Sequence, residues 1–109
     1  MSAEPLVSRL TEIVPTGERV LVTGLVQGVG VRPTVWRLAH SLVLAGQVYN
    51  NASGVVIELW GRAEARELFI RLLYEQKPRL ARIDNVVRQP VNEPAPGGSF
   101  RITESRDGL

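Results

Sequence analysis

The chain has 109 residues, 44% of them hydrophobic, which suits one globular domain with a core of its own and predicts no second domain. Because it contains no cysteine, disulfides, thiolate metal ligands and a cysteine nucleophile are excluded, and we infer a cytoplasmic location. The net charge of +2, the scattered arginines and the absence of an apolar run near the roughly 20 residues of a membrane span lead us to expect no nucleic-acid and no membrane partner.

The first half of the chain predicts a strand followed by a helix. Residues 1–17 mix prolines and a weak apolar stretch, and we expect an extension packed on the domain. Glu18–Val26 is rich in β-branched residues and predicts a strand. Pro33 suits the first turn of a helix, and Gly46 marks the expected end of that helix. The helix carries an apolar face that must pack on the domain: Val35, Leu38, Ala39, Leu42 and Val43.

The middle of the chain predicts a hairpin and a second helix. Gln47–Asn51 and Val55–Trp60 are strand-like runs separated by a short turn, in which we expect Gly54 to have a positive φ. The second helix spans Ala63–Gln76 and ends before Pro78. Its apolar face repeats the spacing of the first helix: Ala65, Leu68, Phe69, Leu72 and Leu73.

The last third predicts two more strands. Arg79–Gln89 is expected as a fourth strand, Pro90–Gly98 as a loop, and Ser99–Thr103 as a last strand with Phe100 and Ile102 pointing inward. The resulting order is β-α-β-β-α-β with an extra terminal strand. It predicts an α+β, ferredoxin-like split βαβ sandwich, with two helices on one face of an antiparallel-rich sheet.

The most informative segment joins the first strand to the first helix through two glycines: Val26-Gln27-Gly28-Val29-Gly30-Val31-Arg32. Gly28 and Gly30 let the backbone turn with positive φ, and the helix that follows presents unpaired N–H groups. Arg32 adds a planar, permanently charged fork that can hold two anionic oxygens. The segment predicts a phosphate site. The alternative is a glycine-rich turn whose arginine faces water.

Two motifs, in this order, resemble those of acylphosphatases. The glycine segment is similar to their VQGVxxR loop. The run Gly46-Gln47-Val48-Tyr49-Asn50, followed by Gly54 and Val56, is similar to their GxVxNxxxGxV element. The resemblance covers residues 18–104, so it makes 1–17 an N-terminal extension and 105–109 a C-terminal tail. Because Gly30 and Pro33 flank Arg32, the resemblance is closer to the N-terminal acylphosphatase-like domain of the hydrogenase maturation carbamoyltransferases, the HypF proteins, than to free-standing acylphosphatases.

The resemblance implies an active site without metal or cofactor. The glycine loop would bind the phosphate of an acyl phosphate through Gln27, Gly28, Val29, Gly30, Val31 and Arg32. The implied catalytic residues are Arg32, which grips the phosphate, and Asn50, which orients the attacking water. The chain departs from the family pattern at two positions. Val31 stands for phenylalanine or methionine behind the loop, and Gln47 stands for an aromatic residue in one wall of the pocket.

The predicted site has no evident general acid, which favours a leaving group that is a weak base. A carboxylate, with a pKa of ~4, leaves unprotonated, whereas an alkoxide does not. We therefore expect hydrolysis of acyl phosphates. The substrate would be carbamoyl phosphate if the chain is part of a [NiFe]-hydrogenase maturation protein, whose further domains would be its partners. Two alternatives stay open: a free-standing acylphosphatase, and a non-catalytic ferredoxin-like module that binds RNA or protein.

Four other residues invite a functional role, but a structural one is expected for each. His40 has no second histidine or acid at ligand spacing, so we expect it on the helix surface. Asn51 neighbours the proposed catalytic amide and is expected to be a turn residue of the hairpin. Trp36 and Trp60 are expected to pack in the core or at its rim.

Overall fold

The computed structural model describes residues 16–106. Its elements are β1 (Thr16–Leu25), α2 (Val31–Ser41), β2 (Ala45–Asn50), β3 (Val55–Gly61), α3 (Ala63–Gln76), β4 (Arg82–Val91) and β5 (Arg101–Ile102). The predicted order of elements is confirmed. β1 begins two residues before the expected start of the first strand. The packing predicted for the N-terminal extension concerns mainly residues 1–15, which lie outside the described residues.

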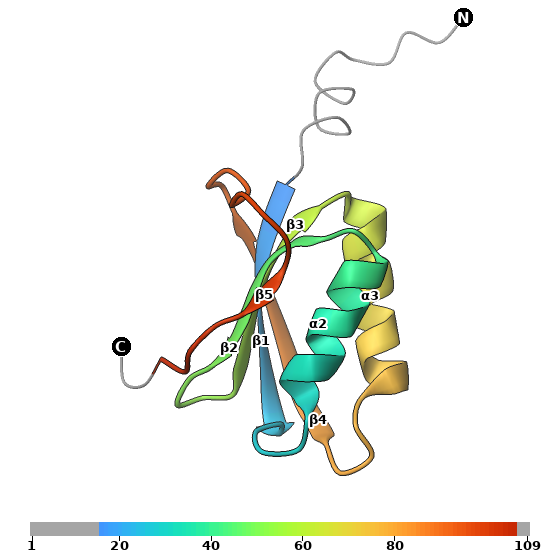
Figure 1. Ribbon diagram of the computed structural model, residues 1–109. Coiled ribbons are helices and arrows are strands. Elements are labelled where there is room, and N and C mark those ends of the chain that lie inside the picture. Colours follow the sequence, from blue (N-terminus) through green and yellow to red (C-terminus); the bar gives the residue numbers. More distant parts are fainter. Residues whose placement is uncertain (1–15, 107–109) are drawn as a thin grey trace, which may run out of the picture.

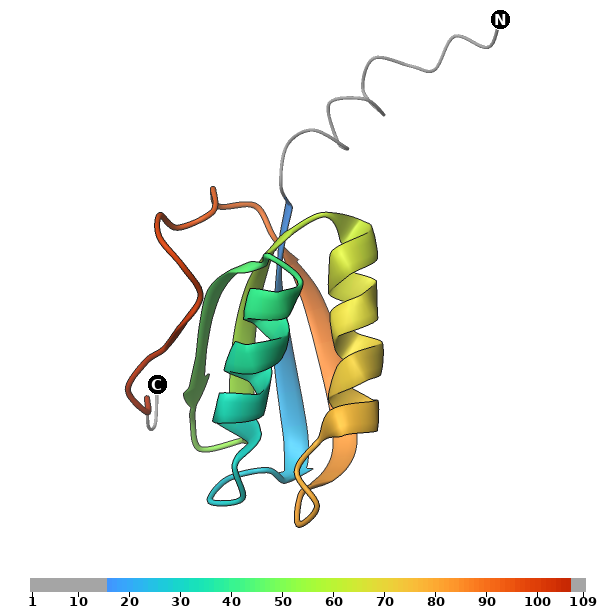
Figure 2. The same cartoon turned by 45° about the vertical axis from the view of Figure 1, so that its right-hand side comes forward.

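The strands form one sheet in the order β4-β1-β3-β2-β5. β1 pairs antiparallel with β3 and with β4, β2 pairs antiparallel with β3, and the short β5 runs parallel to β2. Figure 1 and Figure 2 show that α2 and α3 lie side by side on the same face of the sheet. This is the ferredoxin-like α+β arrangement predicted from the order of elements.

The core lies between the sheet and the two helices. α2 contributes Val35, Leu38 and Ala39, and α3 contributes Phe69 and Leu73, so both predicted helix faces are correct at these positions. They pack against alternate strand residues that point toward the helices: Val20, Val22, Val48, Val55, Ile57 and Leu59. The helices have 11 and 14 residues, and in the described part of the chain neither is long and apolar enough to cross a membrane.

A buried ion-pair cluster joins β1, α3 and β4. The Glu18 carboxylate accepts a hydrogen bond of 2.8 Å from Arg66 and two, of 2.7 and 2.8 Å, from Arg88. Burial raises the pKa of Glu18, but the hydrogen bonds from Arg88 and Arg66 outweigh burial and hold the pKa below its usual value. The cluster therefore stabilises the fold only while Glu18 is ionised.

The end of the first helix differs from the prediction. The apolar pattern continues through Val43 toward Gly46, but α2 ends at Ser41. Val43 has a φ of 56° and is 90% exposed. The N–H of Leu44 donates to the carbonyl of Ala39 at 2.9 Å, which closes the helix in the manner of a Schellman motif with valine at the left-handed position. The helix thus ends without a glycine.

Two glycines serve roles that differ from those predicted. Gly46 lies inside β2 with a φ of +130°, and a Cβ there would be 1.8 Å from the carbonyl oxygen of Glu58. The expected positive φ at Gly54 is wrong, because the φ of Gly54 is not positive. A Cβ at Gly54 would lie 2.2 Å from the carbonyl oxygen of Val22. Both glycines are required because another strand passes too close for a side chain.

The last strand is shorter than expected. β5 contains two residues instead of the predicted five. Phe100 is 2% exposed and belongs to the core, as predicted, whereas Ile102 is 44% exposed and is not buried as an inward position was expected to be. β5 is an edge strand, and burial at such a position depends on what packs over it from outside the strand.

Candidate active site

The glycine loop is a tight connection between β1 and the N-terminus of α2. Gly28 and Gly30 have φ values of 76° and 90°, in the left-handed region that favours glycine. Gly30 is the N-cap residue of α2, and no side chain caps the helix. Val31, the first helical residue, is 2% exposed and packs in the core, so the smaller side chain that departs from the family pattern is still buried behind the loop.

The loop and the first helical turn present unpaired backbone N–H groups. No residue within 16–106 accepts a hydrogen bond from the backbone N–H groups of residues 27–32. Pro33 has no N–H, and the N–H of Thr34 donates to the carbonyl of Gly30 at 3.4 Å. The first turn carries no acidic side chain. The positive end of the helix dipole therefore faces the loop without a competing carboxylate, as an anion site requires.

Arg32 is the second residue of α2 and is half-buried beside these N–H groups. It makes no hydrogen bond or ion pair with another described residue. In contrast, Arg66 and Arg88 are committed to Glu18. No described residue therefore engages the donors of the Arg32 guanidinium.

Asn50 is the last residue of β2 and reaches the same end of the molecule. Side chains alternate along a strand, so Asn50 points to the helix side of the sheet, as the core residue Val48 does. Figure 1 and Figure 2 place the end of β2 and the start of α2 at the same end of the fold. Asn50 is only 9% exposed, and no described group donates a hydrogen bond to its Oδ1. A buried amide oxygen without a partner is unusual and marks a functional candidate.

The side chain of Gln27 ties the glycine loop to the β2–β3 turn. Its Nε2 donates to the carbonyl oxygens of Asn51 at 2.6 Å and of Gly54 at 2.9 Å. The Oδ1 of Asn51 accepts from the N–H groups of Ser53 at 2.8 Å and of Gly54 at 3.0 Å, which confirms Asn51 as a turn residue. The amide nitrogen of Gln27 is thus already engaged, a contact that the sequence did not predict.

The segment after β5 holds the end of β2 from its outer edge. The N–H of Arg106 donates to the carbonyl of Asn50 at 2.7 Å, and the Arg106 guanidinium lies 4.1 Å from the centre of the Tyr49 ring. The N–H of Thr103 likewise donates to Val48 at 2.9 Å. The backbone of Asn50 is therefore fixed on both sides while its side-chain oxygen stays unpaired.

His40 lies on the exposed surface of α2, as expected. Its Nε2 donates to the carbonyl of Phe100 at 3.0 Å, and its ring stacks on Trp36 with centroids 3.9 Å apart. No three His, Asp or Glu side chains in the described part of the chain are placed to hold a metal ion. The contacts of His40 are accordingly structural, because they anchor the segment before β5 to the helix.

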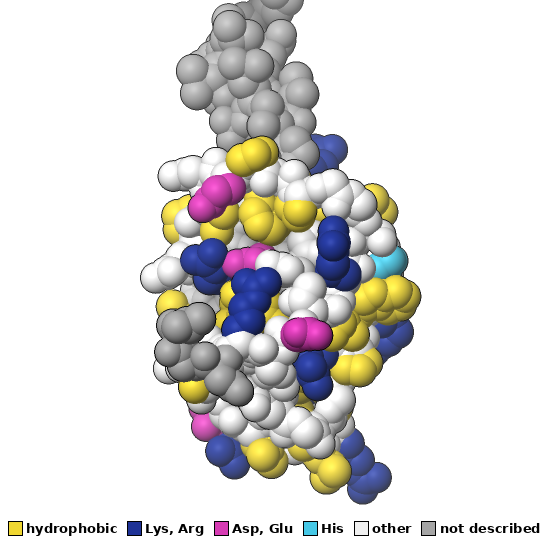
Figure 3. All heavy atoms as spheres, turned by 60° about the vertical axis from the view of Figure 1, so that its left-hand side comes forward, with side chains coloured by type: hydrophobic (Ala, Val, Ile, Leu, Met, Phe, Trp, Pro, Cys, Tyr) yellow, Lys and Arg dark blue, Asp and Glu magenta, His cyan; other side chains and the backbone are white. Residues whose placement is uncertain are grey.

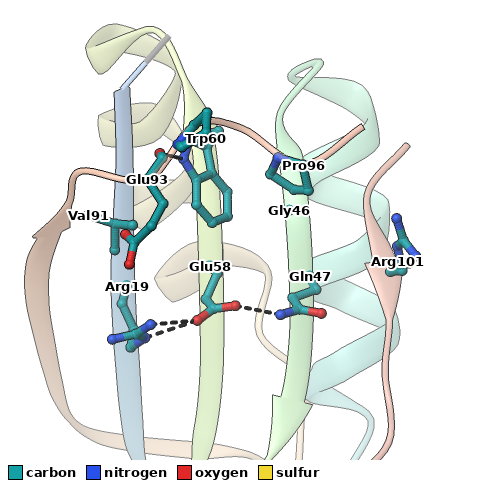
Figure 4. Close-up of a pocket in the computed structure, with 10 residues that line it drawn as sticks. Arg19, Gly46, Gln47, Glu58, Trp60, Val91, Glu93, Pro96 and Arg101 are labelled. Carbon is teal, nitrogen blue, oxygen red and sulfur yellow. Dashed lines mark hydrogen bonds and ion pairs between the residues drawn. The ribbon is translucent and has the colours of Figure 1, made fainter. Parts of the chain in front are cut away.

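The expected role of Gln47 in the active-site wall is wrong, because Gln47 lies on the other face of the sheet. Figure 3 views the molecule from that side, where basic, acidic and apolar side chains interleave. Figure 4 shows Gln47 and Arg19 on either side of Glu58. Arg19 Nε donates to Glu58 at 3.0 Å and Gln47 Nε2 donates to it at 2.5 Å. These residues line a cleft of about 410 Å³ beneath Trp60, and strand alternation separates this cleft from Asn50.

The aromatic side chains on this face are not available for stacking. Tyr49 and Trp60 are each 8% exposed, and the Trp60 indole N–H donates to the carbonyl of Glu93 at 2.9 Å. Trp60 therefore packs at the rim, as predicted. A sheet that binds RNA by stacking needs exposed aromatic faces, so these two residues do not favour the RNA-binding alternative.

The family follows from a comparison with known proteins. The acylphosphatase family model matches residues 18–102, which is most of the chain. The chain belongs to the acylphosphatase family. Its glycine loop and Asn50 both lie inside the matched region, so the two predicted motifs are parts of one family domain.

Relatives of this acylphosphatase-family chain fall into long and short proteins. It is 42% identical over 87 residues to the carbamoyltransferase HypF2 of Cupriavidus necator, covering 80% of this chain and 11% of that protein. The acylphosphatase of Koribacter versatilis is 42% identical over 86 residues, covering 77% of this chain and 76% of that protein. The chain therefore spans about a ninth of the length of the carbamoyltransferase.

A solved structure agrees with this assignment. The chain superimposes on full-length HypF in its phosphate- and nucleotide-bound form with a TM-score of 0.77 and 38% identity, covering 86% of this chain and 13% of that one. The chain is thus similar both to a small part of a HypF protein and to most of a short acylphosphatase.

Proposed function

We propose that this protein hydrolyses acyl phosphates in the cytoplasm, with carbamoyl phosphate as its substrate. One observation carries the proposal: the glycine loop and Arg32, at the start of α2, lie at the same end of the fold as Asn50, at the end of β2. Among residues 16–106, nothing pairs with the loop N–H groups, with the Arg32 guanidinium or with the buried Oδ1 of Asn50. The loop N–H groups and Arg32 are donors that suit a phosphate, and the Asn50 side chain suits the water molecule that attacks it.

The reaction would begin with the phosphate in the glycine loop. The N–H groups of residues 28–32 and the Arg32 guanidinium would hold its oxygens and stabilise the charge that develops in a loose phosphoryl-transfer transition state. The Oδ1 of Asn50 would accept a hydrogen bond from the attacking water and aim it at phosphorus. Attack forms the new P–O bond and breaks the bond between phosphorus and the acyl oxygen, which leaves as a carboxylate without needing a proton. Both hydrogens of the water end on the phosphate product.

The nature of the relatives supports carbamoyl phosphate. The C. necator and other long relatives are named carbamoyltransferases, and this chain matches only a small part of each. If it acts as such a part, further domains of a [NiFe]-hydrogenase maturation protein would be its partners. A free-standing acylphosphatase is the second candidate, favoured by the match to the K. versatilis enzyme over three quarters of that protein.

The test compares carbamoyl phosphate, benzoyl phosphate and glycerol phosphate as substrates, with and without a chelator. We expect both acyl phosphates to be cleaved and glycerol phosphate to be inert, because no general acid protonates an alkoxide. Chelator should have no effect, since Arg32 and the backbone N–H groups, and not a metal ion, would stabilise the charge of the transition state. Equal rates on acyl and alkyl phosphates, or loss of activity in chelator, would contradict this mechanism.

Two controls separate substrate choice from folding. Circular dichroism establishes that the protein is folded before its rates are compared. Preference for benzoyl over carbamoyl phosphate would favour the free-standing acylphosphatase. A folded protein that cleaves neither acyl phosphate would contradict the proposed activity of this chain.

A further inference from the structure

Gln27 is the contact between the two halves of the candidate site. It sits in the glycine loop, which would grip the phosphate, while its side chain reaches the turn that directly follows Asn50 in the chain. The two bonds cross 24 and 27 residues of sequence and end on carbonyl oxygens at the start and the end of the turn, those of Asn51 and Gly54. One NH₂ group thereby spans the turn.

Both N–H bonds of the Gln27 amide are needed for this contact. A primary amide has two hydrogens, and accepting carbonyls at 2.6 and 2.9 Å take one each, which fixes the orientation of the side chain. The side chain is therefore not free to bind phosphate. The loop that carries Gln27 contains two glycines in the left-handed region, and glycine has the greatest conformational freedom of all residues. The two hydrogen bonds of Gln27 therefore restrict the conformations open to this loop.

This restraint joins the glycine loop to the turn that follows Asn50. The Gly54 and Ser53 N–H groups are held by Asn51, and the Asn51 N–H donates to the Gly54 carbonyl at 2.9 Å, so the turn is internally rigid. The two hydrogen bonds of Gln27 therefore couple the position of the glycine loop to the position of this turn. Catalysis by orientation is sensitive to displacements of about 1 Å between reacting groups.

We propose that Gln27 is a positioning residue, which clamps the phosphate loop to the β2–β3 turn and so aligns the water held by Asn50 with the bound phosphate. This inference rests on the proposed function, because it concerns the same site. It assigns the Gln27 side chain to alignment and leaves the binding of phosphate to the loop backbone and Arg32.

Three substitutions separate alignment from other roles. Gln27→Glu keeps the shape but replaces the NH₂ donor with a carboxylate that both carbonyls repel, and it should lower kcat about 10- to 100-fold. Gln27→Lys supplies an ammonium group that can donate to both carbonyls, so it should stay within about fivefold of the parent. Ser53→Ala is the matched control on the same turn, because Ser53 is exposed and contributes its backbone N–H rather than its hydroxyl.

The inhibition constant of inorganic phosphate provides the second readout. It should change less than about threefold in Gln27→Ala, since the phosphate-binding donors are retained and no charge is added beside them. A double-mutant cycle with Asn50→Ala provides the third. If Gln27 acts through Asn50, Gln27→Ala should cost far less when Asn50 is already alanine. Near-parental kcat in Gln27→Glu, or effects that multiply in the double variant, would overturn the proposal.

Nuclear magnetic resonance tests the alignment without turnover. In the parent, inorganic phosphate should shift the backbone N–H signals of Gly28 and Gly30 and also the side-chain amide signal of Asn50. In Gln27→Ala the loop signals should still shift while the Asn50 signal no longer responds. An unchanged Asn50 response in Gln27→Ala would overturn the proposal.

The same spectra distinguish the two hypotheses. A parent that binds phosphate but hydrolyses no acyl phosphate would contradict the proposed function, and the response of Asn50 in Gln27→Ala would then decide the role of Gln27 by itself. A parent that shows no response to phosphate would overturn both.

Discussion

Replacing Asn50 with alanine should make the protein more stable and much less active. The Oδ1 of Asn50 is buried without a donor among the described residues, and such an oxygen destabilises a fold by about 1–3 kcal/mol. Truncation removes this penalty but loses packing worth roughly 0.8 kcal/mol per buried methylene equivalent. The net expectation is a gain of about 1 kcal/mol, which corresponds to a rise in Tm of about 4–8 °C for a domain of this size.

Thermal and urea unfolding in phosphate-free buffer measure the stability, because a bound anion would itself stabilise the folded state. Val48→Ala is the matched control. Val48 lies on the same strand and face but is fully buried and apolar, so its truncation should lose about 2 kcal/mol. Activity on benzoyl phosphate should fall on the order of 10²-fold in Asn50→Ala, with the inhibition constant of phosphate much less affected.

The opposite result would be informative. A loss of more than about 1 kcal/mol in Asn50→Ala would show that the amide is part of the fold, and inactivity would then have no bearing on water orientation. Unchanged turnover in the folded variant would refute the catalytic role directly. A gain in stability together with a loss of turnover is the pattern of a residue kept for function at the expense of the fold.

Three further substitutions test other parts of the structure. Arg32→Lys should lower kcat/KM on the order of 10²- to 10³-fold in steady-state assays, because lysine offers a point charge instead of a bidentate fork, and a folded variant with near-parental rates would contradict the phosphate role. Glu18, whose pKa is lowered in the folded state by Arg88 and Arg66, contributes stability above its unfolded pKa of about 4.3 and loses it as the pH falls through the folded value. Urea unfolding of Glu18→Gln should therefore show a loss of about 2–4 kcal/mol at neutral pH and a shallower dependence on acid, and an unchanged acid slope would count against the cluster. Val43→Gly should raise the free energy of unfolding by about 0.5–1 kcal/mol, because Val43 has a φ of 56° and is 90% exposed, and a decrease would contradict its left-handed conformation.

The sequence by itself determined the order of elements, the helix faces and the location of the glycine loop. These features rest on local signals. Apolar residues repeat with the period of a helix, and a residue such as Phe69 is buried because of its place in that repeat. Gly28 and Gly30 have the expected left-handed φ because the chain must reverse there between a strand and a helix. The two family motifs were also readable, since each is contiguous or nearly so.

Only the tertiary structure decided what depends on segments that are distant in sequence. Gly46 and Gly54 are required by the carbonyls of neighbouring strands, and local turn rules therefore assigned them the wrong roles. Gln47 and Asn50 lie in the same short motif, but an odd spacing along a strand sends them to opposite faces, so one supports Glu58 and the other enters the candidate site. The two hydrogen bonds of Gln27 join the loop to a turn 24 and 27 residues away, and no local pattern encodes a contact that exists only after the sheet has formed.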